Sequence, residues 1–155
     1  MSRCLIRKAR EEDCPEIARF AAQLGYPTTD DAVRKRLERL MSSSNDVVFV
    51  AETGDGALAG WVHGVLSQFL ESDYRVEIAG LVVDEQFHRQ GIGRDLVKHV
   101  EQWAMENGVD EVSVRCRTTR AQAHSFYEEL GYRNVKTQIV FRKTLSSGGS
   151  SSARP

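Results

Sequence analysis

The hydrophobic pattern of this 155-residue chain changes period several times, and each change marks a new element. Apolar residues first recur at helical spacing behind Asp13, whose side chain is placed to cap a helix that carries Pro15 in its first turn. A second helix begins at Thr29, and a β-rich block follows it. The pattern predicts strands over 3–8, 46–52, 57–69, 74–83, 112–117 and 132–143, and helices over 13–24, 29–41, 92–107 and 119–130.

The order of these elements, β-αα-βββ-α-β-α-β, predicts one α/β (α+β) domain over residues 1–145. We expect a single mixed, mostly antiparallel sheet with helices on both faces. Residues 146–155 are rich in serine and glycine, and they offer nothing apolar to bury. We therefore expect a disordered tail that lies outside the fold.

Composition excludes several classes of protein. A chain with 41% hydrophobic and 28% charged residues is typical of a globular domain. Its 21 basic and 22 acidic side chains leave a net charge of -1, so no basic footprint predicts nucleic-acid binding, and any anionic ligand must be bound locally. The apolar runs are far shorter than the roughly 20 residues of a membrane span, and the N-terminal residues do not resemble a secretory signal. We expect a cytoplasmic protein without membrane contact.

Cysteine and histidine spacing gives no sign of a metal or of a disulfide framework. The three cysteines form an odd set without a short-spaced pair, and the histidines lack metal-ligand spacing. We expect no metal.

The segment from Val82 to Arg94 carries the chemistry. A strand runs into a polar loop, then into Gly91-Ile92-Gly93 and an amphipathic helix. Glycines let the backbone approach a ligand, and the unpaired N–H groups of a helix N-terminus attract anions. Together with Arg89 and Arg94 this arrangement suits a pyrophosphate. A tight turn that packs the helix on the sheet is the structural alternative, and the dinucleotide fingerprint lacks its third glycine, because position 96 is leucine.

These residues resemble the acyl-CoA-binding motif of the GNAT superfamily of N-acetyltransferases, in its bacterial, aminoglycoside-acetyltransferase-like branch. Residues 77–83 resemble the strand before that motif, and residues 123–132 resemble the family's second signature. The resemblance covers about residues 3–143 and implies that acetyl-CoA is the cosubstrate. It implies these cofactor-binding residues: Leu81, Val82, Val83, His88, Arg89, Gln90, Gly91, Ile92, Gly93 and Arg94. We expect the first three to pair with the pantetheine amides through their backbone, after a bulge that Gly80 eases.

Two positions depart from the family pattern. His88 stands where the family usually has Arg or Gln, in a position that mostly offers its backbone N–H to the pyrophosphate. Arg120 stands where many members carry an asparagine near the pantetheine arm. We expect cofactor binding to survive the first change, whereas a role for position 120 has to be argued anew.

The resemblance also implies the two catalytic groups. Glu77 is the candidate base, and strand alternation predicts that it shares a face with Ala79, Leu81 and Val83. Tyr127 matches the family tyrosine that protonates the leaving thiolate. Their alternatives are a solvated surface carboxylate for Glu77 and a core aromatic ring for Tyr127.

The sequence thus predicts an N-acetyltransferase in which a primary amine attacks the thioester directly. Its acceptor stays open among a small amine, an aminoglycoside-like molecule and a protein amine. A non-catalytic acyl-CoA-binding or regulatory module on the same fold is the alternative function. The prediction leaves a homodimer open.

Overall fold

A computed structural model describes residues 4–146 and divides the chain into two compact units, one ending at Cys116 and one beginning at Arg117. The first unit contains β1 (Leu5–Lys8), a 3₁₀ turn η1 (Glu11–Asp13), α1 (Cys14–Gln23), α2 (Asp30–Met41), β2 (Asp46–Glu52), β3 (Leu58–Ser67), β4 (Arg75–Val83), a second 3₁₀ turn η2 (Glu85–Phe87), α3 (Ile92–Glu106) and β5 (Val112–Val114). The second unit contains α4 (Ala121–Glu129).

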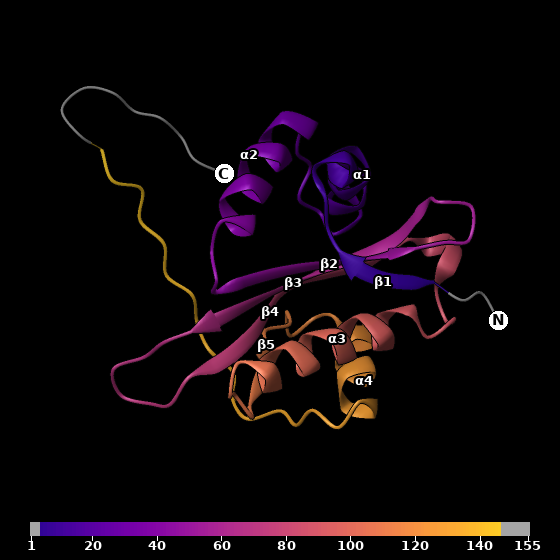
Figure 1. Cartoon of the computed structure of the whole chain (residues 1–155). Helices are drawn as coiled ribbons and strands as arrows, with labels where there is room; N and C mark the ends of the chain where they lie inside the picture. The colour runs from indigo at the N-terminus through magenta and orange to yellow at the C-terminus, as the bar shows by residue number, and fades with distance from the viewer. Residues whose placement is uncertain (1–3, 147–155) are drawn as a thin grey trace. The chain divides into compact units, whose positions relative to one another are not determined.

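The strands form one sheet in the order β1-β2-β3-β4-β5 (Figure 1). The first four strands pair antiparallel, and β4 and β5 pair parallel. The parallel pair is connected through α3, because a parallel connection needs a crossover long enough to return to the same end of the sheet. The predicted mixed and mostly antiparallel sheet is confirmed.

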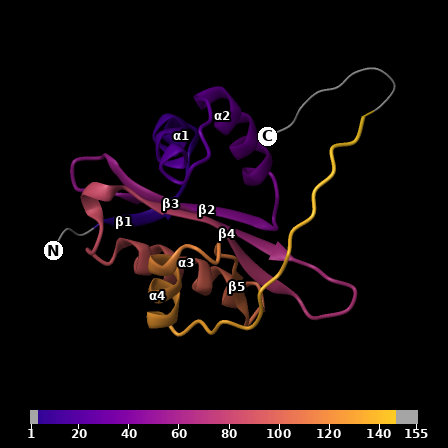
Figure 2. The same cartoon turned by 180° about the vertical axis from the view of Figure 1, so that it is seen from behind.

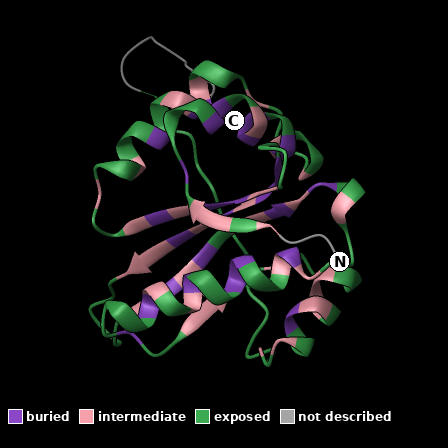
Figure 3. Ribbon diagram, turned by 45° about the vertical axis from the view of Figure 1, so that its right-hand side comes forward, coloured by how far each residue is buried: buried purple, intermediate pink, exposed green. Residues whose placement is uncertain are grey.

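Helices cover both faces of this sheet. Figures 1 and 2 show α1 and α2 on one face and α3 on the other. The α1/α2 layer has a core in which Phe20 and Leu37 meet Val50, Leu58 and Val82 of the strands. The opposite layer is closed by α3, along which buried positions recur (Figure 3); they are Ile92, Leu96, Val97, Val100 and Ala104. Their spacing is the helical period that the sequence predicted.

The cap predicted at Asp13 is wrong. The Asp13 carboxylate makes no capping bond to α1; it accepts hydrogen bonds from both terminal nitrogens of Arg7, at 2.8 and 3.0 Å, and from the Arg10 N–H at 2.7 Å. Burial raises the pKa of this carboxyl, but the bonds from Arg7 and Arg10 more than offset that effect and hold the pKa below its usual value. The residue therefore ties β1 to the start of α1 by an ion pair. Thr29 does cap its helix as predicted, since its hydroxyl accepts from the Ala32 N–H at 3.1 Å.

In the second unit, the closing strand predicted over 132–143 is not observed. Residues 130–146 are assigned to no helix or strand, and their large apolar side chains at Val135, Ile139, Val140, Phe141 and Leu145 are exposed. Alternating apolar residues mark a segment that can form a strand. A strand forms only where a neighbour supplies hydrogen-bond partners, and the pattern does not identify that neighbour.

Other boundary predictions have mixed outcomes. One domain over 1–145 stays a prediction, and the predicted tail lies outside the described residues from 147 onward. In residues 4–146, no helix is long and apolar enough to cross a bilayer.

Candidate functional site

The site begins where β4 and β5 stop pairing. Their register runs from Val76 opposite Val112 to Ile78 opposite Val114, where β5 ends. Strand β4 continues to Val83, still paired with β3 on its other side. Its last residues therefore have one edge at which the described strands place no partner.

A β-bulge lies at the same point. His63 and Gly64, which are consecutive on β3, pair with Gly80 and Ile78, so Ala79 is an extra residue on β4. The sequence anticipated a bulge eased by Gly80, and the register confirms one. The structure adds a second reason for this glycine, because a Cβ at Gly80 would lie 3.0 Å from the Trp61 ring.

The backbone groups of β4 beyond the bulge are divided between its two edges. The Asp84 N–H donates to the Ala59 carbonyl on β3 at 2.8 Å. Successive residues of an antiparallel strand direct their N–H and C=O groups to opposite sides, so Val82 also faces β3, opposite Trp61. Leu81 and Val83 direct theirs away from β3, toward the open edge. Of the three residues expected to bind the pantetheine arm through their backbone, only Leu81 and Val83 offer groups for it, and Val82 does not.

The bulge also corrects the predicted position of Glu77. Because Ile78 and Gly80 pair with neighbouring residues of β3, they lie on opposite faces, and Glu77 therefore shares a face with Gly80 and Val82. This is the face covered by α1 and α2, and it is not the face of Leu81 and Val83 as the unbroken alternation predicted. The Glu77 side chain is 21% exposed, with an oxygen 3.4 Å from Nε of Arg115. Sequence reasoning missed this partner, which lies just beyond the end of β5.

The loop after β4 is held by bonds to its own backbone. Asp84 is buried, and its carboxylate caps the turn η2 with a long contact of 3.5 Å to the Gln86 N–H. The Phe87 N–H donates to the Asp84 carbonyl at 2.8 Å. Nε2 of His88 lies 2.8 Å from the Val83 carbonyl, while the His88 N–H donates to the Glu85 carbonyl at 3.3 Å. Sequence reasoning missed the role of Asp84, although an aspartate directly after a strand is a common capping signal.

Two left-handed residues follow this turn. Arg89 has φ of 64°, and among residues 4–146 it is the one non-glycine residue with a positive φ. Gly91 has φ of 80° and precedes α3, whose first described hydrogen bond runs from the Asp95 N–H to the Gly91 carbonyl at 3.0 Å. The N–H groups of the first helical turn thus lack helical partners, which makes a site for an anion. A left-handed arginine costs about 1–2 kcal/mol, and such strain is concentrated at functional sites.

Positive charge accompanies these N–H groups. Arg89 and Arg94 are exposed, and neither takes part in an ion pair within the described part of the chain. Two carboxylates, Glu85 and Asp95, lie nearby in sequence and reduce the local charge. The open edge of β4, the left-handed loop and the two arginines fit a ligand with an amide-bearing arm and a pyrophosphate, which is the chemistry of CoA.

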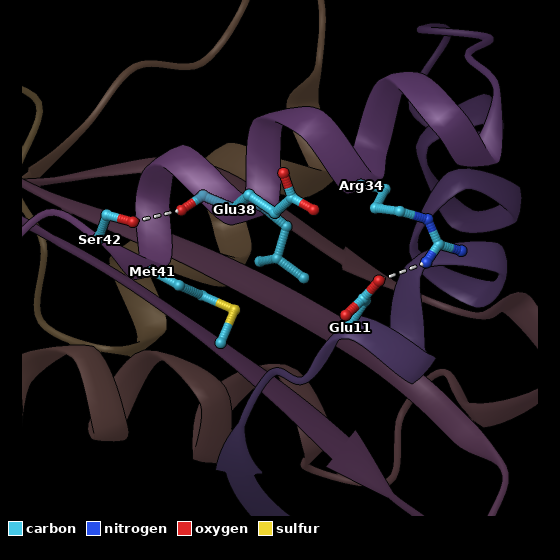
Figure 4. Close-up of a pocket in the computed structure, with 6 residues that line it drawn as sticks. Glu11, Arg34, Glu38, Met41 and Ser42 are labelled. Carbon is cyan, nitrogen blue, oxygen red and sulfur yellow. Dashed lines mark hydrogen bonds and ion pairs between the residues drawn. The ribbon is translucent and has the colours of Figure 1, made fainter.

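Two hollows lie outside these groups. One of about 370 Å³ borders the loop and is lined by Arg19 of α1, by the β2–β3 turn and by Asp84, Gln86 and Phe87. The other, of about 260 Å³, lies along α2 (Figure 4), where Arg34 donates to Glu11 at 2.9 Å and Met41 supplies an apolar wall. Neither is lined by Glu77, by Tyr127 or by residues 88–94. No group of three or more His, Cys, Asp or Glu side chains that could hold a metal occurs in residues 4–146.

Tyr127 belongs to the second unit and is described within it. Its ring makes edge contacts with Phe126 and Tyr132, at centroid distances of 4.9 and 5.6 Å. The Tyr132 N–H donates to the Tyr127 carbonyl at 3.0 Å just after the helix ends. An aromatic cluster therefore fixes the ring on α4. Arg120 directly precedes α4 and makes no side-chain cap there.

Comparisons with known proteins agree with this fold. Residues 12–132 match the model of the Acetyltransferase (GNAT) family. The chain is 26% identical over 144 residues to an aminoglycoside N(6')-acetyltransferase type 1 of Stenotrophomonas maltophilia, a match that covers 90% of this chain and 93% of the relative. It is 35% identical over 79 residues to an N-acetylaspartate synthetase of Danio rerio, over 50% of this chain and 28% of the relative.

Solved structures show the same architecture. The structure of AAC(6')-Iy in complex with the bisubstrate analogue CoA-S-monomethyl-acetylneamine superposes with a TM-score of 0.82 at 20% identity. The match covers 93% of this chain and 100% of that chain. At this identity the likeness concerns the fold.

The left-handed conformation of Arg89 predicts an order of stability between two substitutions. Arg89→Gly and Arg89→Ala both remove the charge, but only glycine adopts a positive φ without steric cost. We expect the glycine variant to be the more stable by about 1 kcal/mol, measured by urea unfolding. An alanine variant as stable as the glycine variant would mean that residue 89 is not left-handed.

Proposed function

The chain belongs to the GNAT family of acetyltransferases and is an acetyl-CoA-dependent N-acetyltransferase, and we propose that a primary amine is its acceptor, with Glu77 as base and Tyr127 as acid. The observation that carries the cofactor site is the stretch of β4 beyond Ile78, which has an open edge and leads into the left-handed loop and α3. Both relatives named above have names that place the acetyl group on a nitrogen. We therefore include aminoglycosides among the candidate acceptors, beside small amines and protein amines.

The roles of the cofactor-binding residues follow from their backbone groups. Bound acetyl-CoA supplies an acetyl thioester, whose carbonyl carbon the amine attacks. Leu81 and Val83 bind the amide-bearing arm through the open edge of β4. The N–H groups of residues 89–93 and the side chains of Arg89 and Arg94 bind the pyrophosphate.

Proton transfer is the task of two side chains. The Glu77 carboxylate removes a proton from the acceptor ammonium, directly or through a water, so that the nitrogen lone pair becomes nucleophilic. Tyr127 donates its hydroxyl proton to the departing sulfur as the carbon–sulfur bond breaks. The position of Glu77 beside the last paired residues of β4 supports the first role, and the family resemblance of residues 123–132 supports the second.

Turnover tests the proposed function. We expect thiol release from acetyl-CoA above the hydrolysis blank with at least one member of an amine panel that contains an aminoglycoside, a diamine, an amino-acid amide and a lysine peptide. Acetyl-CoA at 100 times its dissociation constant should also raise the free energy of unfolding by about 2.7 kcal/mol. Binding without turnover across the panel would favour the non-catalytic module, and no binding at all would reject the proposal.

Glu77→Gln should lower turnover by about 100-fold near neutral pH, because a carboxamide does not accept the ammonium proton. Turnover should recover as the pH rises and the amine loses its proton to solvent, while acetyl-CoA affinity stays unchanged. The measurement is the pH profile of kcat/KM for the acceptor. Glu106→Gln, an exposed carboxylate at the end of α3, is the control. A Glu77→Gln enzyme with the wild-type profile would show that another base acts.

Tyr127→Phe should lower turnover by about 100-fold while folding and acetyl-CoA binding persist, because the substitution removes the hydroxyl that donates the proton and keeps the buried ring. Tyr132→Phe removes a hydroxyl from the neighbouring ring of the same aromatic cluster and should keep turnover near the wild-type value. The measurement is single-turnover acetyl transfer, in which product release does not limit the rate. Turnover of Tyr127→Phe within a factor of two of wild type would reject the acid role.

A further inference from the structure

The side chain of His88, which stands where the family usually has Arg or Gln, makes a contact of its own within the structure. Its Nε2 lies 2.8 Å from the Val83 carbonyl oxygen, five residues earlier. A carbonyl oxygen only accepts hydrogen bonds, so Nε2 must carry the proton. The ring is exposed, yet it points back to the end of β4 and does not extend into solvent.

This contact closes the turn between β4 and the phosphate-binding loop, which we define as residues 88–94. Within the turn, the Phe87 N–H donates to Asp84 at 2.8 Å, but the contact of the Asp84 carboxylate with the Gln86 N–H and that of the His88 N–H with Glu85 are longer, at 3.5 and 3.3 Å. The bond from the His88 ring is therefore the short contact by which the end of the turn is held to the strand. Directly after it comes Arg89, whose left-handed conformation is unfavourable without outside support.

We propose, building on the cofactor site of the proposed function, that His88 is a positioning residue that holds the phosphate-binding loop in its binding conformation through the bond from its Nε2–H to the Val83 carbonyl. With this bond in place, the backbone at Arg89 already has its strained conformation before the ligand binds. The free energy of binding is then not reduced by the cost of ordering the loop. The bond also takes one of the two lone pairs of the Val83 carbonyl. On the open edge of β4, the cofactor arm then finds the N–H groups of Leu81 and Val83, and the Leu81 carbonyl as the acceptor that carries no bond from His88.

The test compares CoA with pantetheine, which keeps the amide-bearing arm and lacks the pyrophosphate. His88→Ala should weaken CoA binding by about 3- to 10-fold, the loss expected for one hydrogen bond, when measured by calorimetry. Pantetheine binding, measured by NMR titration, should stay unchanged. His88→Gln keeps an N–H donor and should restore CoA affinity to within about twofold of wild type, as expected for a donor that reaches the same carbonyl.

His99→Ala is the matched control. His99 is also an exposed histidine whose ring contacts a backbone carbonyl, that of Asp95 at 2.9 Å, but it lies further along α3. Its substitution should leave CoA affinity unchanged. A nitrogen-15 spectrum of the ligand-free protein at alkaline pH gives a second readout, with the His88 proton expected on Nε2.

The outcomes separate this inference from the proposed function. If the wild type does not bind CoA, the proposed function fails. If the wild type binds CoA and His88→Ala binds it equally well, or loses CoA and pantetheine affinity by the same factor, the positioning role alone is overturned. A ring protonated on Nδ1 in the ligand-free protein would also overturn it, whatever the stability of the variants.

Discussion

The site depends on hydrogen bonds that β4 does not make within the sheet. An interior strand satisfies its N–H and C=O groups on both sides, and a buried group without a partner costs about 1–3 kcal/mol. Beyond Ile78, β4 keeps β3 but has no further residues of β5 beside it. A ligand that lies along this edge as an extended, amide-bearing chain can take the place of the absent strand. In the proposed function, the preference for such a ligand therefore originates in the backbone of Leu81 and Val83, whatever their side chains.

A single extra residue determines which side chains surround that edge. If Ala79 were paired regularly and no bulge were present, alternation would put Glu77 on the α3 face, on the same side as Leu81 and Val83. Because Ala79 is bulged out of the pairing, the carboxylate lies on the α1/α2 face, and Arg115 is its partner. The α1/α2 layer thereby receives an ionisable group at the point where β4 and β5 part. Gly80 makes the same arrangement sterically possible, because Trp61 occupies the space that a side chain would need.

The parts of the fold that follow from local pattern were predictable from the sequence. Strand β2 and the start of α3 lie where the hydrophobic periodicity predicted them. A long stretch with apolar residues along one face can bury that face as one type of element only. Gly80 predicted a bulge in β4, but it did not predict which residue is the extra one, and the position of that residue decides the face on which Glu77 lies. The partner of Asp13 was also hidden, because Arg7 competes with the helix terminus for the same carboxylate. The prediction of a strand after α4 was wrong for a related reason: strand propensity is local, whereas a strand forms only beside a neighbouring strand.

The charge of the chain explains why geometry matters so much at this site. A net charge of -1 provides no long-range attraction for an anionic ligand, and salt screens charges over about 8 Å under physiological conditions. Near the loop, Arg89 and Arg94 are opposed by Glu85 and Asp95, so the local excess of positive charge is small. Binding must then rely on N–H groups at hydrogen-bond distance, whose contribution falls steeply when their direction changes. In the proposed site we therefore expect affinity to depend on the backbone conformation of residues 88–94, so that contacts that fix this conformation affect binding without touching the ligand.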